Sequence, residues 1–223
     1  MPLVAASSSL AADLARGVAA LSLAVSAEQQ RKLLAFVELL GKWNRTYNLT
    51  AIREPERMIT HHLLDALAVL PRLPERAGLR LLDVGSGGGI PGLPLAIARP
   101  DWQVTLVDAN HKKVAFLTQA AIELGLANVD AHATRIEAFA PAAPYDVVIS
   151  RAFADIATFA GTSAQHLSAT GWLVAMKGVH PDAELAEVPA GLRVIATHAL
   201  HVPGLDAARH LIVMQKSDAT EPS

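Results

Sequence analysis

One stretch of this sequence, LLDVGSGGGIPGLP at positions 81–94, limits the possible folds more than any other. The apolar run from Leu79 to Val84 includes one acid and then gives way to glycines, which predicts a buried strand that enters a tight turn. The residues after the glycines predict a helix. Since open α/β sheets bind nucleotides where a strand ends and a helix begins, we expect a ligand site at this turn.

The sequence on the carboxyl side of the turn alternates between strand and helix patterns. Further strands are predicted at 104–108, 129–133, 145–150, 172–177, 193–201 and 210–216, the last at or near a sheet edge. Helices are predicted at 92–99, 111–125, 153–167 and 181–187. Together with 79–84, these elements indicate an α/β fold with a mostly parallel, seven-stranded sheet and helices on both faces.

Two helices are predicted before the turn. Ser26 and Gln29 fit a capping box, and apolar residues then recur at helical spacing to about Asn44. A second helix is expected from Pro55 to Leu70. The expected organisation is an Ala-rich tail or short helix at 1–26, a helical extension at 27–72, the main domain at 79–216 and a loose polar tail at 217–223.

Composition limits the partners and the compartment. The 223 residues suit one domain, and a net charge of −2 excludes a wholly basic surface, so any contact with nucleic acid must be a local patch. The absence of Cys excludes disulfides and thiolate metal sites. Residues 1–26 lack a basic start, and no apolar run approaches the ~20 residues of a membrane span. We therefore expect a cytoplasmic protein.

The spacing of the glycines indicates which nucleotide the turn binds. Ile90 stands where a dinucleotide fingerprint requires a third glycine after Gly85 and Gly87. Asp83 would repel a pyrophosphate but suits a cationic amine, which S-adenosylmethionine carries. Asp108, at the end of the second strand, can accept hydrogen bonds from ribose hydroxyls, as in both kinds of site. The pattern favours a methyl donor over a dinucleotide, although Asp83 could instead cap the next helix and Asp108 could belong to a plain turn.

Basic and aromatic residues alternate at the end of the first predicted helix. Lys42, Arg45 and Arg53 surround Trp43 and Tyr47, a combination that can contact phosphates and bases. A solvated helix end is the alternative interpretation.

Two adjacent histidines follow in the second helix, His61 and His62, with Asp65 four residues after the first. No Cys or further acid stands at metal-ligand spacing, so no metal site is predicted and these residues are expected to be satisfied polar groups.

Several stretches together resemble the bacterial ribosomal RNA small subunit methyltransferase G family, also called glucose-inhibited division protein B. They are KWNRTYNLTAIREP (42–55), HHLLDAL (61–67), LLDVGSGGGIPGLPLAI (81–97), VDANHKKVAFL (107–117), TRIEAF (134–139), YDVVISRAFA (145–154), MKG (176–178) and ARHLIVMQK (208–216). The resemblance runs from about residue 27 to 216. Ala207 and Ala208 depart from it, since family members tend to have Gly and Glu there.

The resemblance implies a class I S-adenosylmethionine-dependent methyltransferase, Rossmann-like in fold, with a helical amino-terminal extension. It also implies that S-adenosylmethionine is the cofactor and that N7 of a guanine in 16S rRNA is the methyl acceptor. The cofactor contacts that it implies are Gly85, Ile90, Ile136, Glu137 and Arg151, which Asp83, Gly87 and Asp108 join from the pattern itself.

Guanine N7 carries a lone pair and no proton, so its attack on the methyl group needs alignment but no general base. No residue is assigned a catalytic role, and Arg151 is the one candidate. Candidate RNA-binding residues are Lys42, Arg45, Arg53, Lys112, Lys113, Lys177 and Arg209.

We expect a monomer that acts on 16S rRNA within the small subunit or an assembly intermediate. The alternatives are an S-adenosylmethionine-dependent methyltransferase of a small molecule or protein, and a non-catalytic nucleotide-binding module, for example one that senses a dinucleotide.

Overall fold

The protein is described by a computed structural model that covers residues 2–151, 153 and 155–217, with side chains from residue 9 onward. Two alanines of the SRAFA motif, Ala152 and Ala154, lie outside the described residues, as does the predicted polar tail beyond Ser217. Among the described residues, no helix combines the length and the apolar character that crossing a membrane requires.

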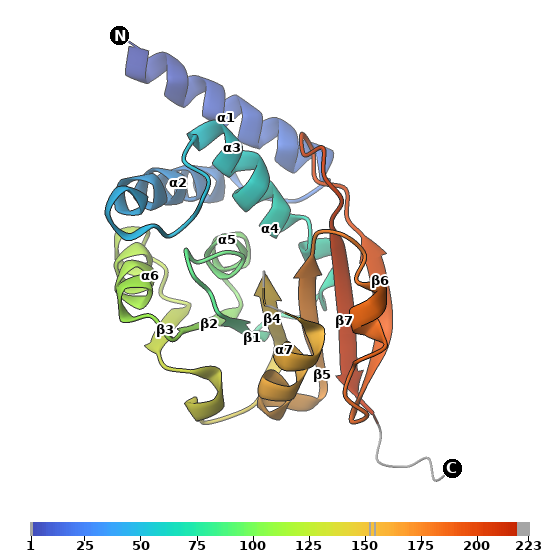
Figure 1. Cartoon of the computed structure of the whole chain (residues 1–223). Coiled ribbons are helices and arrows are strands. Elements are labelled where there is room, and N and C mark those ends of the chain that lie inside the picture. Colours follow the sequence, from blue (N-terminus) through green and yellow to red (C-terminus); the bar gives the residue numbers. More distant parts are fainter. Residues whose placement is uncertain (1, 152, 154, 218–223) are drawn as a thin grey trace.

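A seven-stranded sheet forms the centre of the molecule (Figure 1). Its strands are β1 (Arg80–Val84), β2 (Gln103–Asp108), β3 (Val129–Ala133), β4 (Tyr145–Arg151), β5 (Leu167–Lys177), β6 (Leu192–Ala199) and β7 (His210–Lys216). The strand order is β3-β2-β1-β4-β5-β7-β6. Strands β1 to β5 run parallel, and β7 lies antiparallel between β5 and the edge strand β6. The mostly parallel seven-stranded sheet predicted from the sequence is therefore confirmed.

The chain before β1 is helical. It forms α1 (Pro2–Ala20), α2 (Ala27–Tyr47), α3 (Pro55–Met58), the π-helical turn η1 (Ile59–Leu64), α4 (Asp65–Leu67) and the 3₁₀ turn η2 (Leu70–Arg72). The capping box is confirmed, because Ser26 Oγ accepts from Gln29 N and Gln29 Oε1 accepts from Ser26 N. The helix predicted from Pro55 to Leu70 is present as α3, η1 and α4 in direct succession.

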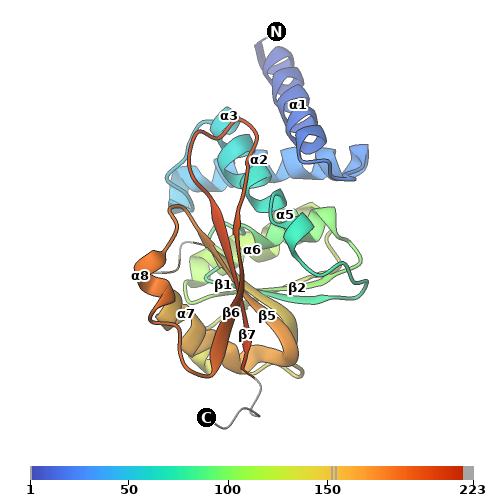
Figure 2. The ribbon, with the colours of Figure 1, turned by 90° about the vertical axis from the view of Figure 1, so that its right-hand side faces the viewer.

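The remaining helices cover the two faces of the sheet. They are α5 (Gly92–Ala98), α6 (His111–Glu123), the turn η3 (Ile136–Ala138), α7 (Ile156–Ser163), the turn η4 (Ala164–His166) and α8 (Asp182–Leu185). Figure 2 shows α5 and α6 on one side of the sheet and α7 and α8 on the other.

The helix predicted at 153–167 is shorter in the structure, because Asp155 caps α7 by accepting a hydrogen bond from Thr158 N at 2.6 Å. The strand predicted from residue 172 starts earlier, at Leu167, where it pairs with Tyr145.

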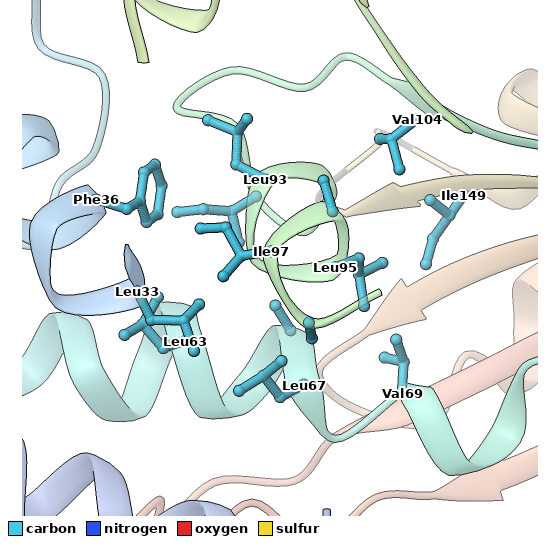
Figure 3. Close-up of a cluster of buried hydrophobic side chains, with 14 of the residues drawn as sticks. Leu33, Phe36, Leu63, Leu67, Val69, Leu93, Leu95, Ile97, Val104 and Ile149 are labelled. Carbon is cyan, nitrogen blue, oxygen red and sulfur yellow. The ribbon is translucent and has the colours of Figure 1, made fainter. Parts of the chain in front are cut away.

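Helix α5 lies between the helical extension and the sheet (Figure 3). Its apolar side chains meet those of α2 and η1 on one side and those of β2 and β4 on the other. The residues labelled in this cluster are Leu33, Phe36, Leu63, Leu67, Val69, Leu93, Leu95, Ile97, Val104 and Ile149. One buried cluster runs from Leu14 in α1 to Val213 in β7, so the extension and the sheet share a core. A domain border between residues 72 and 79 remains a prediction.

Candidate active site

The turn after β1 is tied to the end of β2 by main-chain hydrogen bonds. Gly85 N and Ser86 N both donate to Val107 O, at 2.8 and 3.1 Å, and Gly87 N donates to Asp108 Oδ2 at 2.9 Å. The turn and Asp108 are therefore held as one unit at the carboxyl edge of the parallel strands, where open α/β sheets bind ligands.

The glycines of this turn fall into two groups. Gly85 and Gly87 have positive φ angles, +69° and +57°. A Cβ atom on Gly85 would meet nothing within 4 Å, so the main chain there borders open space. By contrast, a Cβ on Gly89 would lie 2.5 Å from Leu93 Cδ1, and one on Gly92 would lie 2.3 Å from a side-chain carbon of β2. The first pair leaves room for a ligand, while Gly89 and Gly92 allow close packing of α5.

Asp83 is fully buried beneath the turn, with 0% of its surface exposed. Its Oδ2 accepts a hydrogen bond from Gly92 N at 2.9 Å, so it does cap α5, the alternative left open by the sequence. Its Oδ1 has no hydrogen-bond partner among the described residues. Burial raises the pKa of Asp83 to about 7, and the nearby charge of Arg151 opposes that rise. The buried carboxyl thus keeps one oxygen unsatisfied and its charge poorly compensated.

Asp108 lies 8% exposed at the end of β2. Its Oδ2 accepts from Gly87 N and its Oδ1 accepts from Asn110 N, at 2.9 and 2.8 Å. Lys113 Nζ lies 3.7 Å from Oδ2, so this lysine belongs to the turn and is less available to RNA than the sequence suggested. A carboxylate has about four lone-pair sites, which leaves capacity for two further donors.

The other residues implied as cofactor contacts differ in accessibility. Ile136 opens the turn η3 and packs in the buried cluster that contains the ends of β1 and β2, while Glu137 is exposed beside it. Thr134 N donates to Asp108 O at 3.2 Å, which places this loop next to the glycine turn. Ile90 is only 5% exposed and lies in the main core cluster. Its side chain therefore serves packing, and only its main chain can border a ligand.

Arg151, at the end of β4, is held by the helical extension. Its Nη1 donates to His61 O at 2.9 Å and to Asp65 Oδ2 at 3.2 Å. Asp65 is 1% exposed, and its other oxygen accepts from Arg209 Nε at 2.8 Å. One buried carboxylate from the helical extension therefore joins an arginine of β4 to an arginine that precedes β7. With Lys177 and His210, these three residues line a cavity of about 310 Å³ beside the carboxyl ends of β4 and β5.

His62 connects this cluster to the segment after α2. Thr50 Oγ1 and His62 Nε2 lie 2.8 Å apart, and His62 Nδ1 lies 3.0 Å from His61 O. Burial and the charge of Arg151 lower the pKa of His62 to about 4, so its ring is neutral at pH 7. We assign the proton to Nδ1, which leaves Nε2 to accept from the Thr50 hydroxyl.

The seven candidate RNA-binding residues fall into two groups, according to whether a nearby carboxylate already compensates their charge. Lys177 lies 2.7 Å from Glu184, Arg209 pairs with Asp65, and Lys113 faces the acid at the end of β2. The other four form no ion pair among the described residues and are exposed; they are Lys42, Arg45, Arg53 and Lys112. The structure brings the first three of these together around one groove.

Asp65, Thr50 and Glu184 each fix a side chain of the site by a direct contact, and sequence patterns gave little indication of that role. The four-residue spacing of His61 and Asp65 was the one available signal, and it pointed to a shared helix face. The partners of Asp65 come from β4 and from the loop before β7, which no local pattern reveals.

Open glycine main chain between two buried acids, at the carboxyl edge of this sheet, defines a class I methyltransferase. The sequence matches the GidB family, described as rRNA small subunit methyltransferase G, over residues 29–212. The chain belongs to this family. A relative from Laribacter hongkongensis named Ribosomal RNA small subunit methyltransferase G is 54% identical over 200 residues, which cover 90% of this chain and 95% of the relative.

Solved structures confirm the class I fold at lower sequence identity. An S-adenosylmethionine-dependent methyltransferase from Aquifex aeolicus is 18% identical with a TM-score of 0.54, over 78% of this chain and 97% of that one. An O-methyltransferase from neocarzinostatin biosynthesis, solved with S-adenosylmethionine, is 19% identical with a TM-score of 0.50, over 63% of this chain and 49% of that one.

Proposed function

We propose that the protein transfers a methyl group from S-adenosylmethionine to N7 of a guanine in 16S rRNA. The observation that carries the proposal is the open main chain at Gly85, flanked by the buried acids Asp83 and Asp108. S-adenosylmethionine offers a cationic amine, two ribose hydroxyls and no phosphate, which suits two carboxylates. Asp108 suits the ribose of either ligand, but Asp83 would repel a pyrophosphate, so the site favours a methyl donor over a dinucleotide.

Each residue around the turn has a proposed role in holding the donor. Gly85 and Gly87 let the main chain approach it closely, and Asp108 accepts hydrogen bonds from its ribose hydroxyls. Asp83 supplies negative charge beneath its cationic groups. Ile136 borders its adenine.

Three further residues have supporting roles in this proposal. Glu137 lies at the exposed rim of the adenine site, and Ile90 contributes its main chain alone. Arg151 is the candidate for contact with both donor and acceptor, since its charge acts on Asp83 and its side chain lines the same cavity as Asp65 and Arg209.

The bound donor would supply a methyl group on a positively charged sulfur. The residues of the chain then have to align guanine N7 with that methyl group and exclude water, because no proton has to be removed first. His62, the buried histidine of this region, is neutral and engaged through both ring nitrogens, which suits an aligning role better than that of a base. Asp65 offsets part of the positive charge of Arg151 and Arg209, so the acceptor can gain positive charge beside them.

The proposed substrate is 16S rRNA within the small subunit or an assembly intermediate, and the proposed location is the cytoplasm, where ribosomes assemble. Support comes from the family and from the charge of the chain. A net charge of −2 gives a weak overall field, so recognition is expected to require structured RNA. We propose a monomer that uses no metal.

Transfer of a radiolabelled methyl group tests this function. Purified protein and labelled S-adenosylmethionine are incubated with small subunits from methylation-deficient cells and, as the control, from untreated cells. We expect label in the RNA of the first sample and little in the second, whose site is already methylated. Equal incorporation into both, or none into either, would refute the proposal. Calorimetric titration with NAD then distinguishes a dinucleotide-binding module, which would bind NAD and not the methyl donor.

A further inference from the structure

A groove of about 480 Å³ lies between α1 and α2, next to the segment that leads into α3. Its apolar lining includes Leu10, Leu34 and Val37. The charged residues on its rim are three cations and one carboxylate, namely Lys42, Arg45, Arg53 and Glu38. None of the three cations forms an ion pair with any residue that the structure describes, so the rim keeps a net positive charge even with Glu38 counted.

Gly41 indicates that this groove is kept open. It lies inside α2, where a glycine destabilises a helix relative to alanine. The φ angle of Gly41 is not positive, and a Cβ atom on this residue would meet nothing within 4 Å. Neither the main chain nor the packing therefore requires glycine at this position. The missing side chain leaves space in the groove that Gly41 lines.

The groove lies close to the candidate active site, on the other side of the segment that follows α2. Asn44, which lines the groove, accepts a hydrogen bond from Thr50 N at 2.9 Å. Leu49, which precedes Thr50, packs on the glycine turn, since a Cβ on Gly88 would lie 3.4 Å from Leu49 O. The loop between α2 and α3, visible at the left of Figure 1, therefore separates the groove from the turn by the thickness of one segment.

We propose that this groove binds a single-stranded segment of the ribosomal RNA substrate, next to the guanine that is methylated. Phosphates would contact Lys42, Arg45 and Arg53, and one base would lie against the apolar lining. Proteins hold single-stranded RNA in positively charged grooves that follow the phosphates, with aromatic side chains against the bases. In this groove the described apolar lining is aliphatic, so a base would make apolar contact there without aromatic stacking. The inference rests on the proposed function, because it takes RNA as the substrate.

The salt dependence of RNA binding tests the three cations. The probe is 16S rRNA transcribed in vitro and free of ribosomal proteins, and the variant is Lys42→Gln/Arg45→Gln/Arg53→Gln. Each phosphate contact to a single strand contributes about 0.7 to the slope of log K against log salt, so the slope should fall by about 2. We expect binding at least about tenfold weaker at physiological salt. Arg193→Gln, which removes an exposed cation from the edge strand β6, is the matched control and should change neither quantity.

A second pair of variants tests the space in the groove without changing any charge. Gly41→Leu would fill the groove, while Gly41→Ala adds a methyl group that meets nothing within 4 Å. Alanine and leucine both have a higher helix propensity than glycine, so neither substitution is expected to unfold α2. A change in RNA binding can then be attributed to the filled groove. We expect Gly41→Leu to weaken RNA binding and to raise KM for RNA with donor affinity unchanged, and Gly41→Ala to resemble the wild type.

The outcomes separate this inference from the proposed function. If the wild-type protein binds and methylates the RNA while the triple variant keeps its salt slope and affinity, the groove is not an RNA site and the proposed function stands. If the variants lose activity on assembled subunits but bind free RNA normally, the groove contacts a ribosomal protein and the inference is wrong. If the wild-type protein does not bind the free RNA but methylates small subunits from methylation-deficient cells, the inference is wrong and the proposed function stands. If it does neither, both proposals fail.

Discussion

Replacing Asp83 by Asn tests the electrostatics of the glycine turn, because it removes a buried charge and keeps the shape of the side chain. Burial raises the pKa of Asp83 to about 7 from an ordinary value of 3.8. At 1.36 kcal/mol per pKa unit, ionising this carboxyl costs about 4 kcal/mol more in the folded protein than in the unfolded chain. The amide oxygen of Asn can still accept the hydrogen bond that Gly92 N donates.

Whether this carboxyl stabilises or destabilises the fold as the pH rises depends on which state, folded or unfolded, binds its proton more tightly. The folded protein holds the proton of Asp83 more tightly than the unfolded chain does, so this residue lowers the free energy of unfolding as the pH rises from about 4 to about 7. Between about pH 5 and pH 8, the wild type should lose about 2–3 kcal/mol relative to Asp83→Asn. Any amide hydrogen that Asn leaves unpaired adds a constant, so the comparison of the two pH dependences isolates the carboxyl.

Urea denaturation of both proteins at several pH values measures this difference, with tryptophan fluorescence as the signal. Calorimetry with S-adenosylmethionine completes the test. We expect the affinity of the wild type to increase as the pH rises through 7, because the ionised carboxylate attracts the cationic donor. Asp83→Asn should bind more weakly at pH 8 and without that increase. Parallel pH profiles of the two proteins in both measurements would refute the proposed role of this charge.

Five further substitutions, one of them a control, test the packing and the charges around the site. Gly92→Ala should lower the free energy of unfolding by about 1–3 kcal/mol through overpacking, whereas Gly161→Ala, whose Cβ meets nothing within 4 Å, should not lower the melting temperature. Asp65→Asn should destabilise by about 2 kcal/mol in urea and weaken donor binding in calorimetry, because two arginines lose their shared carboxylate. Lys112→Glu should flatten the salt dependence of RNA binding and leave donor affinity unchanged. Lys113→Glu should weaken the donor affinity itself, since it places a second carboxylate beside the acid of β2.

Features that depend on neighbouring residues could be predicted from the sequence. The capping box of Ser26 and Gln29 was readable because its hydrogen bonds span three residues. The strand at 129–133 was predicted with the bounds that the structure has. The turn at Gly85 and Gly87 was predicted because positive φ angles favour glycine wherever they occur.

Features that depend on distant partners could not be predicted. Lys177 and Arg209 were RNA candidates because the sequence shows a cation but not the acid that compensates it. Glu184 lies seven positions from Lys177 and reaches it only because α8 folds back, and Asp65 reaches Arg209 across 144 positions. In the same way, the groove between α1 and α2 arises from the packing of two helices, so its three cations appeared in the sequence only as charges near a helix end.

The identity of the methylated nucleoside tests direct transfer to guanine N7 most sharply. Small-subunit RNA from methylation-deficient cells is treated with the protein and S-adenosylmethionine, digested, and mapped by mass spectrometry. We expect one new methylated residue, a 7-methylguanosine in 16S rRNA, and none when Asp108→Ala replaces the wild type. A methyl group on a hydroxyl or on an exocyclic amine would contradict the account, because transfer to either atom requires the loss of a proton. A methyl group on a base other than guanine would contradict the proposed acceptor.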